Sequence, residues 1–399
     1  MGQSKITEMK RVAVCVIMSL VAACGANGEL SGSGTPSRSA AAPHEPPSAR
    51  PSLGEQLGRD GTTKTPVPAQ TSRSAGRWKV VYRQKGDDRE QVFQSVMFTD
   101  VAAVGEDRAW AVGERAYSTA GHEPLLAEWD GRRWRKVMDA LPKEVRMCHL
   151  TRVDASDPGN VWVIAHDPEG GEDGLLHFDG QRWSHTPGMR QEEVLALPGG
   201  RAWTFGRKAR YFDGSRWTDH PIPINVQAAQ ALSPESIWAV GEVSTPCGRG
   251  TCGVPAAAYF DGRSWRRTPL SVAESAVSFD TTLKAVLAVD GDKVWAAGGF
   301  TTPDGAFRPV LYQWNGGSWQ AVNVSGGQIT GLARDSRGAL WAATTRWTPE
   351  GPDGYRLLTR GDGPWRSVRP PGPITAVTQT AGGTLLWGVG GDTIVRYMT

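Results

Sequence analysis

The side chains of this chain that could do chemistry are few and scattered. Seven His and five Cys occur among 399 residues. None of them completes a serine-nucleophile elbow, a phosphate-binding loop, a histidine pair at metal-ligand spacing or a Cys-x-x-Cys motif. The sequence therefore does not favour an enzyme, and no cofactor or catalytic residue is expected.

Three histidines still invite a metal hypothesis. His122, His149 and His166 fall in or beside turns of two neighbouring sequence units, and imidazole is a common ligand of Zn²⁺. Lone surface histidines are commoner, so we interpret them as such. The run from His166 to Asp173 carries five side chains with ligand atoms in a glycine-containing loop, and such a loop could hold Ca²⁺. A solvated acidic loop is the favoured interpretation.

The cysteines predict one local crosslink. Cys247 and Cys252 bracket four residues inside one connection, a spacing that favours a disulfide in an oxidising compartment. Cys148 is then left without a partner. We interpret it as a small buried residue rather than a nucleophile, because free cysteine is among the most buried residue types.

The N-terminus predicts export. Lys10 and Arg11 precede an apolar run from Val12 to Ala23, which is too short to span about 30 Å of hydrocarbon and is typical of a signal peptide. The small residues before Cys24 resemble a bacterial lipobox, which implies a signal peptide over residues 1–23 and diacylglycerol on Cys24. The protein would then lie outside the cytoplasm, anchored to the membrane. A cleaved secretory signal with an incidental cysteine is the alternative.

Residues 24–75 are expected to form a disordered tether. No aromatic residue occurs in residues 25–75, and Gly, Ala, Ser, Pro and Thr supply 34 of those 51 positions. Such a segment cannot bury enough apolar surface to offset the entropy lost on ordering. The folded part would therefore begin near residue 76.

From residue 76 onward the chain repeats, and tryptophan marks the repeats. Seventeen Trp outnumber 9 Phe and 7 Tyr. One set lies in short apolar runs; it comprises Trp110, Trp162, Trp203, Trp238, Trp295, Trp341 and Trp387. A second set follows Asp-Gly or Asn-Gly pairs; it comprises Trp134, Trp183, Trp217, Trp265 and Trp319, with a variant at Trp365. We expect both sets to pack in the core.

The repeats predict an all-β, seven-bladed β-propeller over residues 76–399. Asp-Gly and Asn-Gly pairs between apolar runs favour type I′ hairpins, in which both central residues have positive φ. Each unit then forms four antiparallel strands, and a ring of such sheets leaves only short edges. The seventh unit lacks a fourth strand, whereas residues 76–82 form a strand without a unit. We expect the N-terminal strand to complete the last blade; a six-bladed ring is the alternative.

The pattern resembles bacterial secreted propellers with degenerate kelch or galactose-oxidase-like repeats. Two aromatic-to-Trp steps carry the likeness, Tyr211 to Trp217 and Tyr259 to Trp265, together with the glycine doublets Gly298-Gly299 and Gly390-Gly391. The Asp-Gly-x-x-Trp turn also looks like a shortened sialidase Asp-box. The resemblance implies a fold, because propellers host hydrolases, oxidases, lectins and scaffolds. Copper chemistry of the galactose-oxidase kind would need Tyr and His ligands, and none can be assigned.

The long connections between strands are the basis of the functional hypothesis. Five of them are expected on one face of the ring, and insertions on one face of a repeat protein often mark its binding face. Trp347, outside both Trp sets, is expected in the last of them, either exposed or folded under its own loop. The full set of candidate contacts is Trp347, His122, His166, Asp167, Phe300 and Tyr355.

The hypothesis is a non-enzymatic binding or scaffolding module for a protein or cell-wall glycan. The alternative is a carbohydrate-active hydrolase or lyase that uses acidic residues of the same face. Such an enzyme needs two carboxylates within about 10 Å of each other. The formal net charge of +3 indicates no phosphate-binding surface, so nucleic acid is not an expected partner.

Overall fold

The computed structural model describes residues 76–398, except for short segments at 86–92, 118–120, 169, 171–172, 249, 273–277, 279–280, 303–304, 349–350 and 381–383. The description concerns residues 74–399, the second of the two units into which the chain divides. The expected signal peptide, Cys24 and the expected tether lie outside the described residues. No helix among the described residues is long and apolar enough to cross a membrane.

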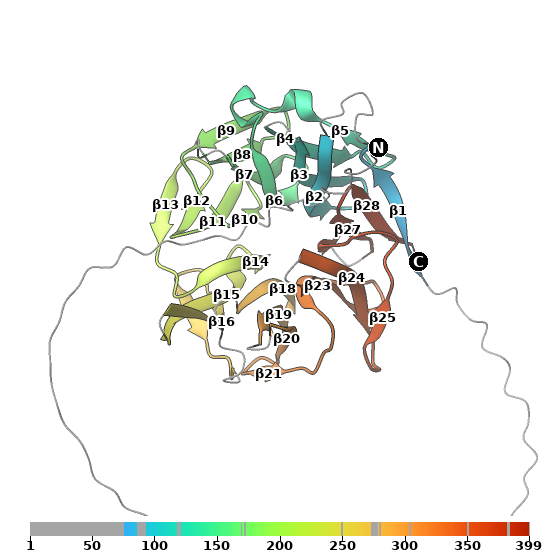
Figure 1. Ribbon diagram of the computed structural model, residues 1–399. Helices are drawn as coiled ribbons and strands as arrows, with labels where there is room; N and C mark the ends of the chain where they lie inside the picture. Colours follow the sequence, from blue (N-terminus) through green and yellow to red (C-terminus); the bar gives the residue numbers. More distant parts are fainter. Residues whose placement is uncertain are drawn as a thin grey trace, which may run out of the picture. The chain divides into compact units, whose positions relative to one another are not determined.

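Seven four-stranded antiparallel sheets follow one another around a ring (Figure 1). The first four are β2 (Phe93–Val104), β3 (Arg108–Tyr117), β4 (His122–Trp129), β5 (Trp134–Lys136); β6 (His149–Asp157), β7 (Asn160–His166), β8 (Gly174–Phe178), β9 (Trp183–Pro187); β10 (Glu193–Leu197), β11 (Arg201–Phe205), β12 (Ala209–Phe212), β13 (Trp217–His220); and β14 (Asn225–Ser233), β15 (Ser236–Cys247), β16 (Gly250–Phe260), β17 (Trp265–Thr268).

The next two are β18 (Thr282–Asp290), β19 (Lys293–Thr301), β20 (Phe307–Trp314), β21 (Trp319–Ala321); and β22 (Gln328–Arg334), β23 (Leu340–Thr348), β24 (Gly351–Arg360), β25 (Arg366–Val368). The seventh combines β26 (Ala376–Gln379), β27 (Leu386–Gly390) and β28 (Thr393–Met398) with β1 (Arg77–Arg83). Two short 3-10 helices, Met138–Ala140 and Lys143–Val145, join the first two blades. The predicted seven-bladed propeller is confirmed, and the six-bladed alternative is wrong.

The N-terminal strand closes the ring. β1 pairs antiparallel with β28 from Arg77 opposite Met398 to Arg83 opposite Thr393, with one irregularity. Trp78 is buried and packs against Tyr397, with ring centroids 5.6 Å apart. The first and last strands therefore share one sheet without a covalent link, as the unpaired repeat elements predicted.

The two Trp sets meet at the interfaces between blades. Trp203, in the second strand of the third blade, contacts Trp265 in the fourth strand of the next blade edge-on, at 5.6 Å and 85°. Trp387 of the last blade meets Trp134 of the first in the same way, at 5.2 Å and 89°. Edge-to-face aromatic pairs contribute about 0.5–1.5 kcal/mol beyond the area that they bury. The repeated Trp therefore hold neighbouring sheets together.

A glycine after the second-strand Trp admits the neighbouring backbone. A Cβ at Gly241 would stand 1.9 Å from the carbonyl oxygen of Asn225, and one at Gly298 would stand 2.0 Å from that of Thr282. Both glycines lie opposite irregularities in the first strand of their blades. The Trp-x-x-Gly spacing is thus a packing requirement, because any side chain would push the first strand away.

The Asp-Gly pairs lie at the predicted hairpins, but their geometry differs from the prediction. Asp130 stands just before the turn, and Gly131 is the residue with positive φ, +87°. The Oδ1 atom of Asp130 accepts hydrogen bonds from the backbone N–H groups of Arg132 and Arg133, at 2.9 and 2.8 Å. The carboxylate therefore caps the turn, and the expectation that Asp occupies a central position of the turn is wrong.

Replacing Trp203 with Ala should lower the free energy of unfolding by about 3–5 kcal/mol, because a nearly fully buried indole is lost from an interface of five rings. Thermal unfolding followed by circular dichroism measures the change. Trp347→Ala is the control: that ring is half-buried and outside the two Trp sets, so its loss should cost less. Equal unfolding temperatures for wild type and Trp203→Ala would contradict the packing assignment.

Candidate functional site

One face of the ring carries paired strands where loops were expected. β15 and β16 stay hydrogen-bonded from Ile237 opposite Phe260 out to Cys247 opposite Gly250. The connections of the first, fifth and sixth blades likewise run out as paired ribbons. The expectation of long loops is wrong for these four blades, because a paired hairpin satisfies its backbone polar groups without a core. We call these four extensions the hairpin face.

The disulfide lies at the end of one of these ribbons. Cys247 and Cys252 are joined by a bond with a Cα–Cα distance of 5.7 Å. Thr245 pairs with Cys252, and Cys247 pairs with Gly250, so the crosslink spans the tip of β15–β16. It therefore braces the part of the ribbon that lies farthest from the body of the blade.

The aromatic candidates do not form one exposed patch. Phe300 is buried, and Trp347 and Tyr355 are half-buried. Trp347 lies on β23 and packs toward Phe307 of the preceding blade, with ring centroids 6.5 Å apart. Trp347 was expected to be either exposed or folded under its own loop; it is half-buried, and the ring contact is with the preceding blade.

Glu114 gathers two of the three candidate histidines. Glu114 and His122 lie on one side of the β3–β4 hairpin, and His149 begins β6 in the next blade. The Oε2 atom of Glu114 lies 3.0 Å from Nδ1 of His122 and 2.9 Å from Nε2 of His149. The two imidazole rings are 4.0 Å apart. The cluster therefore joins two blades through one carboxylate oxygen.

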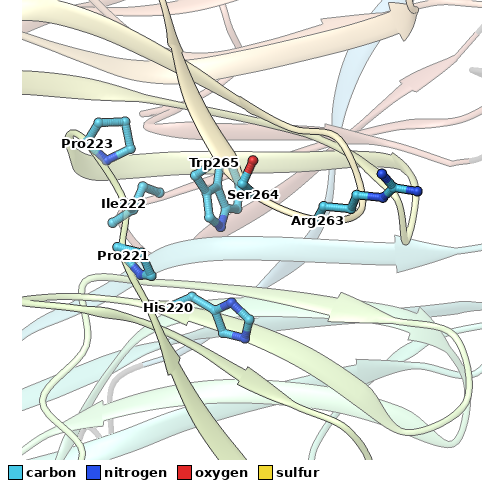
Figure 2. Close-up of a pocket in the computed structure, with 7 residues that line it drawn as sticks. All are labelled: His220, Pro221, Ile222, Pro223, Arg263, Ser264 and Trp265. Carbon is cyan, nitrogen blue, oxygen red and sulfur yellow. The ribbon is translucent and has the colours of Figure 1, made fainter.

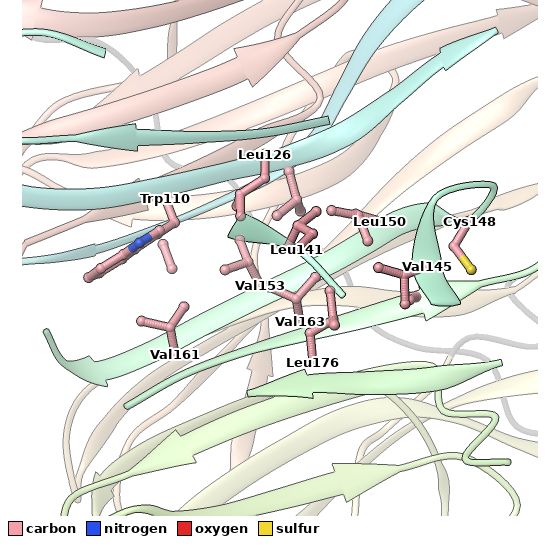
Figure 3. Close-up of a cluster of buried hydrophobic side chains, with 13 residues drawn as sticks. Trp110, Leu126, Leu141, Val145, Cys148, Leu150, Val153, Val161, Val163 and Leu176 are labelled. Atoms are coloured by element: carbon pink, nitrogen blue, oxygen red, sulfur yellow. The ribbon is translucent and has the colours of Figure 1, made fainter. Parts of the chain in front are cut away.

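Packing between the first two blades positions this cluster. The connection from β5 to β6 places Leu141 and Val145 in a buried cluster with Leu150, the residue after His149 (Figure 3). His149 itself is 8% exposed. Burial opposes ionisation of Glu114, but the close contacts and charge interactions with His149 and His122 outweigh it, so the pKa of this carboxyl lies below its ordinary value.

His166 and Asp167 do not join the Glu114 cluster. His166 lies opposite His149 in the β6–β7 pair, but its Nδ1 atom lies 3.3 Å from Oδ1 of Asp173. The same oxygen accepts a hydrogen bond from the backbone N–H of Asp167 at 3.0 Å. Arg190 approaches the other oxygen of Asp173 at 3.7 Å. Asp173 therefore accepts contacts from His166 and Asp167 of its own connection and from Arg190, which follows β9.

Cys148 lies at the end of the same buried cluster (Figure 3). Burial raises the pKa of its thiol to about 11, with the carboxylates of Asp167 and Asp173 adding to the shift. Because the thiolate is the nucleophilic form, a thiol that stays protonated is a poor nucleophile. The interpretation as a small buried residue fits this environment.

The first strands of all seven blades line a central channel with a cavity of about 420 Å³. Its lining includes Arg152 and the three carboxyl groups of Asp100, Asp154 and Glu193. Nε of Arg152 lies 3.4 Å from Oε2 of Glu193, while Asp100 and Asp154 accept backbone hydrogen bonds from Val153 and Ala196 in the following blades. The acidic residues that lie near one another thus line the channel, whereas the sequence analysis expected them on the face with the long connections.

The channel carboxyls titrate at unusually high pH. Burial raises the pKa of Glu193 to about 8, against the opposing pull of Arg152. Burial likewise raises the pKa of Asp154 to about 6, although backbone hydrogen bonds from Ala196 and Ala155 lower it. Glu193 therefore holds its proton to a higher pH than Asp154 does, an ordering of pKa values that acid–base chemistry uses.

A smaller cavity of about 260 Å³ lies between the third and fourth blades (Figure 2). Its lining combines the segment after β13 with the turn before β17: His220, Pro221, Ile222, Pro223, Arg263, Ser264 and Trp265. His220 also contacts the buried Trp203, with ring centroids 4.8 Å apart. This cavity therefore lies at the edge of the packed interface between the two blades.

Comparisons with known proteins identify the fold class and no more. No family model matches the sequence, and no curated protein matches it. A chain of the mitotic checkpoint complex aligns with a TM-score of 0.52 at 11% identity, over 85% of this chain and 99% of its own. YCF48 from Cyanidioschyzon merolae aligns at 0.49 and 17% identity, over 80% and 98%. The protein is a β-propeller.

Replacing Glu193 with Gln should reduce the dependence of stability on pH. With a folded-state pKa of about 8, the native protein holds a proton that the unfolded chain releases above about pH 4.5, so wild-type stability falls as the pH rises toward 8. Gln cannot titrate. Melting temperatures from pH 5 to 9 should therefore fall less in the variant, by roughly 2–5 °C.

The exposed Glu235→Gln is the control for this measurement and should keep the wild-type profile. Parallel curves for wild type and Glu193→Gln would show that the channel carboxyl is ionised across the whole range.

Proposed function

We propose that this chain is a lipid-anchored, extracytoplasmic propeller that binds a protein or cell-wall glycan partner through its hairpin face, without catalysis. The export signal and the lipobox-like ending at Cys24 support the location. The Cys247–Cys252 disulfide suits an oxidising compartment. Under this proposal the kelch-like resemblance concerns the propeller scaffold alone, and the hairpin face determines which partner binds.

The observation that carries this proposal is a length difference among blades. β11 and β12 of the third blade have five and four residues, whereas β15 and β16 of the fourth have 12 and 11. A four-stranded blade therefore closes without the extra length. Ribbons that the core does not need, gathered on one face of a repeat protein, are best explained as contact surface.

The exposure pattern along β15 separates core from surface. Ile237 to Gly241 are buried, whereas Ser244 and Pro246 are exposed. The paired backbone and the disulfide hold this outer part rigid, and a rigid surface loses less entropy on binding. The ribbon is thus a pre-organised platform.

A carbohydrate-active hydrolase or lyase is the second candidate. One observation favours it: Asp154 and Glu193 lie in the same channel with pKa values of about 6 and about 8. A carboxylic acid beside a carboxylate is the pair that glycoside hydrolysis needs. On this alternative the acidic residues lie in the channel rather than on the hairpin face.

A matched pair of serines tests the binding face. Ser244 lies exposed on the β15 ribbon and Ser264 lies exposed in the Asp-Gly turn at the opposite end of the same blade. Capture from the cell envelope of the producing bacterium, quantified by mass spectrometry, should show a partner that Ser264→Arg retains and Ser244→Arg loses by roughly tenfold or more. Equal retention by both variants would contradict the assignment of the face.

The same preparations distinguish the hydrolase. Release of reducing ends from purified peptidoglycan by wild type, lost in Glu193→Gln, would establish catalysis in place of simple binding. Absence of turnover together with a Ser244-dependent partner is the result expected here.

The anchor is tested at Cys24. Cys24→Ser should move the protein from the membrane fraction to the soluble or secreted fraction, because the lipid acceptor is lost. Cys15→Ser, a like substitution within the apolar run, should leave it membrane-bound. Fractionation followed by immunoblotting gives the measurement; unchanged membrane association of Cys24→Ser would rule out lipidation at that residue.

A further inference from the structure

The Glu114 cluster has the composition of a transition-metal site. Glu114, His122 and His149 each offer one ligand atom, and these atoms all lie within 4.8 Å of one another. Two imidazole nitrogens and one carboxylate oxygen form a set that binds Zn²⁺ and leaves a fourth position open. The residues come from the β3–β4 hairpin and from β6, so backbone of two blades holds them.

The two distances to Glu114 suit a metal shared between this carboxylate and each imidazole. Tetrahedral Zn²⁺ with bonds of about 2.0–2.1 Å places its ligand atoms about 3.3 Å apart. The Oε2 atom of Glu114 lies 3.0 Å from one imidazole nitrogen and 2.9 Å from the other. An outward movement of a few tenths of an ångström by these side chains would bring both pairs to the metal-bound separation.

The contact of His149 with Glu114 is close but poorly aligned for a hydrogen bond. Nε2 of His149 is buried and makes no well-aligned hydrogen bond within the described residues, although it lies 2.9 Å from Glu114. A buried polar nitrogen without a well-aligned partner is destabilising. Coordination of a metal through its lone pair would remove that destabilisation.

The burial of the three side chains also fits metal binding with access from one side. The side chains of His149 and Glu114 are 10% and 13% exposed, whereas that of His122 is 31% exposed. Arg115 points to the other side of the hairpin, where it pairs with Glu123 at 3.0 Å. The nearest strongly cationic side chain on that strand is therefore directed away from the cluster.

We infer that Glu114, His122 and His149 bind one Zn²⁺ ion, which links the first-blade hairpin to the first strand of the second blade. The link lies beside the hairpin face, so metal would rigidify one of the four ribbons. This inference does not depend on the proposed partner, because the three ligands are defined by the fold alone.

Equilibrium dialysis of residues 76–399, which contain all seven sheets, tests the inference with Zn²⁺ as the probe. Wild type should bind one equivalent at micromolar concentrations. Glu114→Gln and His122→Gln should weaken binding by more than roughly 100-fold, since loss of even an outer-shell partner costs about 10–100-fold. His166→Ala is the matched control: it removes the neighbouring imidazole that pairs with Asp173 and should bind Zn²⁺ as wild type does.

Two further measurements keep the test decisive if a variant folds poorly. Co²⁺ added to wild type should give the visible absorption of a four-coordinate site without a thiolate charge-transfer band. Zn²⁺ should also slow amide hydrogen exchange in β3, β4 and the start of β6 in wild type. Absence of Zn²⁺ binding by wild type, retention of binding in Glu114→Gln, or its loss in His166→Ala would each overturn the assignment and leave the cluster as an ion-paired brace.

Discussion

The edge-to-face contact between tryptophans of neighbouring blades is the interaction on which the rest of this structure depends. Trp162 and Trp217 meet at 5.7 Å and 80°, and Trp238 and Trp319 at 5.6 Å and 87°. A single blade exposes an apolar face that it cannot cover by itself. The same two tryptophans recur in successive blades, so each blade covers the apolar face of its neighbour. The last blade must therefore pack against the first. Closure by β1 follows from this geometry: without it, Trp341 would lose Trp78.

Much of this architecture could be predicted because its signals are local and repeated. A Trp within a short apolar run recurs in all seven units, and a Trp three residues after Asp-Gly or Asn-Gly recurs in five of them, so the exceptions do not obscure the pattern. Even the ring closure follows from counting, since one strand was missing at the C-terminus and one was spare at the N-terminus. The position of Asp in the turn was missed because sequence does not distinguish a residue at the turn's centre from one that caps it, as Asp130 does through its side chain.

The candidate site was less predictable because it depends on which residues from different blades meet. His122 and His149 were noticed together with His166, but the strand order places Glu114 between the first two and gives His166 its own partner, Asp173. Nothing in the sequence near Glu114 marks it. The channel charges were also missed: Arg152 and Asp154 alternate with other residues on β6, and only the radial arrangement brings Glu193 of the next blade into the same channel. The hairpin extensions looked like loops because β-ladder pairing without a core leaves little hydrophobic periodicity.

Physical constraints leave a propeller of this kind only a few places for function. The inter-blade interfaces are occupied by indole rings, and substitutions there cost stability. The Asp-Gly ends are capped by their own carboxylates, whose oxygens already accept backbone hydrogen bonds; these bonds lower the pKa of Asp130 and Asp213 to about 2. The channel and the hairpin face are the regions in which polar side chains exceed what the fold requires. The channel concentrates charge in a narrow space, which suits acid–base chemistry, whereas the ribbons extend surface outward, which suits a partner. Four ribbons extend beyond the length that a blade needs, and one of them is crosslinked at its tip; for this reason binding through the hairpin face is the role that we propose.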